Sequence, residues 1–204
     1  MSEEDPRPHR PALFSDLTEI IDAAGGASTS SRAEIAAATA AVLVQAGRSP
    51  GDGARFVALA DRVGIDTLAA LWRDADPVSL PGALWALYLL RQWCHSDGDE
   101  VTRLWRTGEP LASADVVVAG VGDYADIGAV QRMADAVLTG VYQADLAVAL
   151  ERAAAFFRVI AAGRRSLGGP ARHAQDGVDL AERNERAAAA LSAAANRWRA
   201  GTLH

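Results

Sequence analysis

The sequence predicts an all-α protein, built as a bundle of about eight to nine helices. Alanine, the strongest helix former, makes up about a fifth of the chain. Valine is the only β-branched residue present in quantity, and it is scattered along the sequence. Apolar residues recur with helical spacing in several segments. Because half of the 204 residues are hydrophobic, the chain is long enough to bury a core of its own.

The most apolar segment, Leu80–His95, is expected to be a buried helix around which the bundle is organised. Ser79 is placed to cap its N-terminus, and Pro81 falls in the first turn, where a missing N–H costs nothing. Apolar side chains cover most of its circumference, which is typical of a helix with neighbours on all sides. Arg91 interrupts the run well before the length that a bilayer requires, so no membrane span is predicted.

The same helix carries a candidate ligand site. Helical spacing places Tyr88, Arg91 and His95 on one face, and Trp85 and Trp93 flank them. Aromatic side chains with a few polar groups are typical of ligand pockets. The favoured alternative is that the three polar side chains reach the end of the bundle and form hydrogen bonds there. No catalytic residue is predicted, because the one cysteine precedes His95 directly and adjacent helical residues point apart.

The segments before the central helix are predicted from caps and turns. Residues 1–12 are charged and proline-rich, and we expect them to be disordered. A short helix is expected over 13–24, and a capping box from Ser31 to Glu34 opens another that ends near residue 46. Residues 54–73 form a helix pair that resembles the helix-turn-helix of DNA-binding proteins. A plain helical hairpin is the favoured interpretation, because the second helix offers few side chains to DNA bases.

The second half of the chain predicts further helices, a linker and a final helix. Helices are expected over 100–107, 115–122, 127–139 and 142–163, so the bundle domain spans residues 13–165. A Gly-Gly-Pro sequence marks residues 166–176 as a linker before the last helix, 177–200. That helix carries a heptad seam, which packs either on the bundle or on another subunit. The seam consists of Leu180, Asn184, Ala187, Leu191, Ala194 and Trp198.

Composition excludes several chemistries. The chain has no lysine, which excludes a Schiff-base lysine, a pyridoxal phosphate anchor and a lysine-containing phosphate loop. Its single cysteine allows no internal disulfide and no cysteine metal cage, which fits a reducing cytoplasm. The acidic cluster after Cys94 matches no metal-binding spacing, and the glycines of 120–125 are not followed by a second strand. We therefore expect no metal and no cofactor.

Charge and terminal sequence indicate the class of partner. The net charge is −6, which disfavours nucleic acid, although residues 151–204 carry nine Arg against five acidic residues. The N-terminus lacks the apolar stretch of a signal peptide, so a cytoplasmic protein is expected. The use of arginine in place of lysine, with much alanine and glycine, is typical of a GC-rich bacterial genome.

Three functions follow from these patterns, and the first is favoured. The first is a non-catalytic helical protein that acts through protein–protein contact and forms a homodimer or binds another protein. The second is a small-molecule-binding protein or enzyme with a pocket beside residues 84–95. The third is a DNA-binding regulator that uses residues 54–73.

Overall fold

All regular structure in the described part of the chain is helical, as the sequence predicts. The computed structural model describes residues 29–47, 62, 64–112, 114–115, 126–143, 145–167 and 173–204. These residues hold seven α-helices and a 3₁₀ turn: α2 (Thr29–Gly47), α5 (Ile65–Trp72), α6 (Leu80–Ser96), α7 (Gly98–Gly108), η1 (Glu109–Leu111), α9 (Ile127–Gln143), α10 (Leu146–Leu167) and α11 (His173–Arg199). The predicted total of eight to nine differs slightly, and the expected elements at 1–12, 13–24, most of 54–64 and most of 115–122 lie outside the described residues.

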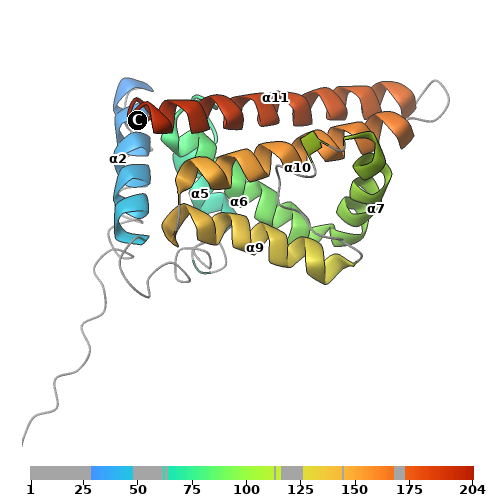
Figure 1. Cartoon of the computed structure of the whole chain (residues 1–204). Coiled ribbons are helices and arrows are strands. Elements are labelled where there is room, and N and C mark those ends of the chain that lie inside the picture. Colours follow the sequence, from blue (N-terminus) through green and yellow to red (C-terminus); the bar gives the residue numbers. More distant parts are fainter. Residues whose placement is uncertain are drawn as a thin grey trace, which may run out of the picture.

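Helix α6 is the hub of the bundle, which matches its expected central position. It contacts each of the other six described α-helices. In Figure 1, α10 and α11 run side by side along one edge, α9 lies along the opposite edge, and α2 stands at the end where the chain terminates. No helix in the described ranges is long and apolar enough to cross a membrane.

The start of α6 follows the predicted cap. Ser79 has extended backbone angles, and its Oγ accepts a hydrogen bond from the Gly82 N–H at 3.3 Å. Pro81 lies in the first turn, where no N–H is needed. A side chain at Gly82 would overlap the main-chain oxygen of Asp76, so the chain must pack closely where it enters the helix. The sequence around Ser79 therefore sets both the beginning and the direction of α6.

One buried hydrogen bond links α2 to α5. The Thr39 hydroxyl donates to the main-chain oxygen of Ile35, one turn earlier, and accepts the indole N–H of Trp72 at 3.1 Å. The Trp72 ring is fully buried, and its centroid lies 6.1 Å from that of Tyr88 on α6. The hydrogen bond holds α2 against α5, and the contact between the two rings holds α5 against α6.

Helices α7 and α10 cross at two glycines. A side chain at Gly108 would overlap the main-chain oxygen of Val159, and one at Gly163 would overlap that of Leu104. The backbones can approach this closely only because neither position carries a Cβ. One layer deeper, the buried ring of Trp105 stacks on Phe156 with centroids 5.1 Å apart.

The C-terminal helix packs on its own bundle, which is one of the two arrangements that the sequence left open. It lies antiparallel to α10, with Glu151 beside Arg199 at one end and Arg165 beside Glu185 at the other. Arg199 donates to both oxygens of Glu151, at 2.5 and 2.8 Å, and these bonds hold the pKa of Glu151 below its usual value. The last helix therefore packs as part of the same helical bundle as α10.

Four boundaries of the last three helices differ from the sequence-based expectation. Helix α9 continues to Gln143 and α10 begins at Leu146, because the side chain of Asp145 accepts the Ala147 N–H and caps α10. Helix α10 extends to Leu167, and α11 starts at His173 instead of residue 177. The sequence His-Ala-Gln-Asp at 173–176 has no glycine or proline, so nothing in it opposes a helix. The segment expected to be a linker therefore contributes residues to both helices.

Candidate binding site

Two of the five predicted ligand residues meet a carboxylate on α9. Arg91, whose side chain is 10% exposed, donates from Nε to Asp135 Oδ1 at 2.7 Å. His95 Nε2 lies 3.2 Å from the same oxygen. Asp135 therefore holds a guanidinium and an imidazole that are one helical turn apart on α6. No local sequence pattern identifies this partner, because a single acidic residue beside the apolar stripe of α9 does not indicate which residue it faces.

The other three predicted ligand residues point to different neighbours. Tyr88 is fully buried against Trp72, and Trp85 is half-buried against the core. The Trp93 ring covers Arg164, whose guanidinium carbon lies 5.3 Å from the ring centroid. Burial lowers the pKa of Arg164, an effect that the carboxylate of Glu100 opposes. From α6, Tyr88 thus lies against a residue of α5, Arg91 and His95 against one of α9, and Trp93 against one of α10.

The cysteine beside His95 is a poor nucleophile. Cys94 is fully buried, and burial together with the charge of Asp135 raises the pKa of its thiol to about 12. The thiol is therefore neutral at physiological pH and packs as a small apolar group. Within the described ranges, no group of three or more His, Cys, Asp or Glu side chains is arranged to hold a metal ion.

Burial of Cys94 predicts a loss of stability at alkaline pH. Its pKa is about 12 in the folded protein against a reference of 9.0, so above pH 9 only the unfolded chain releases this proton. The free energy of unfolding should then fall by up to about 1.4 kcal/mol per pH unit between 9 and 12. Urea denaturation below and above pH 9 measures this slope, and Cys94→Ala corrects for tyrosine ionisation. An equal slope in the variant would contradict the assignment.

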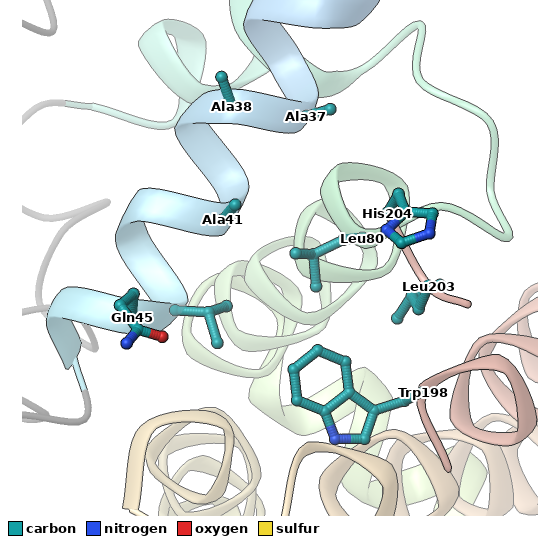
Figure 2. Close-up of a pocket in the computed structure, with 9 residues that line it drawn as sticks. Ala37, Ala38, Ala41, Gln45, Leu80, Trp198, Leu203 and His204 are labelled. Carbon is teal, nitrogen blue, oxygen red and sulfur yellow. The ribbon is translucent and has the colours of Figure 1, made fainter. Parts of the chain in front are cut away.

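A pocket of about 360 Å³ lies at the other end of α6, where α2 meets the C-terminal residues. Figure 2 shows the α2 side chains on one side, Leu80, Leu203 and His204 on the other, and the indole of Trp198 below them. The nine lining residues are Ala37, Ala38, Ala41, Val44, Gln45, Leu80, Trp198, Leu203 and His204. Seven of these are apolar, so the pocket favours an apolar group with a polar end.

The predicted seam of α11 is displaced around the helix. Leu191 and Ala194 are buried, Asn184, Ala187 and Trp198 are half-buried, and Leu180 is 38% exposed. The fully buried positions are Ala181, Ala188, Leu191, Ala194 and Ala195. Because its neighbour Ala181 is fully buried, Leu180 is exposed through its place around α11, outside the buried face of the helix. Most of the apolar face that predicted a subunit contact is therefore covered within the chain.

Searches of protein-family models, curated proteins and solved structures find no significant match to this chain.

Proposed function

We propose that this chain is a non-catalytic helical protein that acts through protein–protein contact, and that its contact surface is the outer face of α2. One observation carries the proposal. From Ile35 to Ala46, α2 contains no charged residue, yet four of these twelve residues are exposed. A helix that is apolar on all sides is normally buried, so the outer face of α2 is suited to a partner.

The outer face is defined by Ala38, Ala41, Val42 and Gln45, all of which are exposed. Their spacing places them on one side of α2, opposite the buried Ala40 and Leu43. Depletion of charge is the usual mark of the core of an interface. Alanines also allow a second helix to approach closely. By contrast, the exposed side of α11 carries Arg183, Arg186 and their acidic neighbours, as expected for a solvated surface.

The partner proposed first is a second copy of the chain. In a twofold-symmetric dimer the same face meets itself, so each apolar contact and each substitution occurs twice. Two α2 helices crossing near Ala41 would cover the exposed Val42 of both copies. The proposal keeps the homodimer that the sequence predicts but assigns the subunit contact to α2, because α11 already packs against α10.

The other functions considered receive less support from the geometry. A small-molecule or catalytic site beside residues 84–95 requires its side chains to converge, whereas Arg91, Tyr88 and Trp93 face three different helices. For a DNA-binding function, most of the first helix of the pair lies outside the described residues. The second, α5, is eight residues long and buries Leu68, Leu71 and Trp72.

Val42→Glu is expected to dissociate the dimer. Val42 is 50% exposed, so the variant should fold, but two buried carboxylates in a symmetric interface should raise the dissociation constant at least about tenfold. Sedimentation equilibrium across the micromolar range measures this constant for the wild type and the variant.

Val148→Glu is the matched control for this experiment. Val148 lies on α10, is 45% exposed and is outside the proposed surface, so its substitution should leave the dissociation constant unchanged. A wild-type protein that is monomeric throughout the concentration range would rule out the homodimer. Equal dissociation of both variants would rule out α2 as the contact surface.

A further inference from the structure

The C-terminal residues reverse direction at the end of α11. Gly201 has a φ of +69°, and its N–H donates to the main-chain oxygen of Trp198 at 3.0 Å. The Thr202 N–H donates to the oxygen of Arg197 at 2.9 Å. This pair of bonds is the Schellman arrangement, in which glycine supplies the left-handed residue that ends a helix. The turn carries the chain back onto the first turn of α6.

The reversed tail, residues 201–204, is held against the bundle by one side chain and one main-chain atom. Leu203 is only 6% exposed and belongs to the core cluster. The main-chain oxygen of His204 accepts the Leu80 N–H at 2.9 Å. The next residue of α6, Pro81, has no N–H, and the N–H of Gly82 is already bonded to Ser79. The tail therefore satisfies the donor at the start of α6 that the helix itself leaves open.

The contacts of the tail indicate which chemical groups can bind beside the pocket at the start of α6. The branched side chain of Leu203 forms part of the pocket wall, and the main-chain oxygen of His204 accepts the N–H of Leu80 at the start of α6. Any extended peptide with a leucine-like residue offers both groups. The pocket still has about 360 Å³ beside Leu203, which leaves room for a longer segment.

We propose that this pocket is one end of a peptide-binding site, that the tail, which forms part of the pocket wall, fills the remainder of that site within the chain, and that a partner protein displaces the tail with an extended segment bearing a leucine-like side chain. The inference rests on the proposed function, because the pocket shares Ala38, Ala41 and Gln45 with the outer face of α2. A tethered occupant competes at high effective concentration, so the tail restricts entry to segments that bind more strongly than it does.

The test uses a chain that ends after Gly201 and a synthetic peptide of residues 200–204, Ala-Gly-Thr-Leu-His. Removal of Thr202–His204 should shift the NMR signal of the Leu80 amide, because its acceptor is lost. Titration with the peptide should move that signal back toward its position in the full chain. The same peptide with Leu203→Ser should have little effect, and the full chain should not respond to either peptide. Circular dichroism verifies that the shortened chain remains helical.

Gly201→Ala tests the tail in a chain of full length. An added Cβ meets no atom within 4 Å, so the substitution strains only the positive φ and leaves the pocket wall intact. The variant should open the tail several-fold more often and gain measurable peptide binding. Gly64→Ala is the matched control, since Gly64 has a φ of +84°, has open space around it and does not line the pocket.

Two results would overturn the inference. The first is a shortened chain whose Leu80 signal is unchanged by peptide up to millimolar concentration. The second is a full chain that binds the peptide as well as the shortened one, because the tail would then not occupy the site. Val42→Glu does not alter a pocket-lining residue, so dissociation of the dimer by that variant tests the α2 contact separately from peptide binding.

Discussion

Gly163→Ala is expected to destabilise the protein by at least about 3 kcal/mol. The added methyl group would overlap the main-chain oxygen of Leu104, and a carbonyl within a helix cannot move aside as a flexible side chain can. Helices α7 and α10 would have to separate, which would also loosen the stacked pair of Trp105 and Phe156. Urea denaturation followed by circular dichroism measures the change in the free energy of unfolding.

Gly140→Ala provides the control for this prediction. Gly140 also lies within a helix, α9, but its added Cβ would be 3.5 Å from that of Ala149, an ordinary contact distance. Because alanine favours the helix over glycine, this variant should be unchanged or stabilised by up to about 1 kcal/mol. A Gly163→Ala variant as stable as Gly140→Ala would show that α7 and α10 do not cross as closely as described.

Trp72→Ala is expected to lower the free energy of unfolding by about 3–5 kcal/mol, the range for removing a large aromatic side chain from a core. Trp72 is fully buried, lies against Tyr88 and donates its indole N–H to Thr39 on α2. The substitution leaves a cavity and removes the hydrogen bond that holds α2. Urea denaturation measures the change in the free energy of unfolding. The NMR signals of α2 residues show whether this helix still packs against α5.

Trp72→Phe separates packing from the hydrogen bond. Phenylalanine fills part of the cavity but has no N–H, so this variant should be destabilised by less than Trp72→Ala. Its loss should include about 1 kcal/mol for the missing bond to Thr39. The proposed contact surface lies on α2, so Trp72→Ala should also weaken dimerisation. Stability equal to that of the wild type would contradict the role of Trp72 in anchoring α2.

Local patterns in the sequence predicted the parts of this fold that depend on neighbouring residues. The abundance of alanine predicted an all-helical chain, which the described residues confirm. Ser79 and Pro81 predicted where α6 begins, because capping involves only the first turn. The apolar circumference of the same segment predicted that it would be surrounded by other helices.

Contacts between distant segments were not predicted. Asp135 joins Arg91 and His95 across 44 and 40 positions of sequence, and no local pattern pairs an acid with a base at that separation. Likewise, the pocket combines α2, α6, α11 and the tail, and of its nine residues only Trp198 was a candidate interface residue. Its existence depends on how three helices meet.

The sequence by itself determined the helical class, the central helix and the exclusion of lysine- and disulfide-based chemistry, because these follow from composition and local periodicity. Only the tertiary structure decided which helical faces are covered. The alanine-rich α11 packs on α10, while the equally alanine-rich α2 keeps one face open. The sequences of α2 and α11 alone do not show which of them is covered within the chain. An apolar stripe predicts a packing neighbour but does not identify it. The antiparallel ion pairs and the close packing of α10 and α11 identify that cover for one helix. For the other, the uncovered face is where we place the partner.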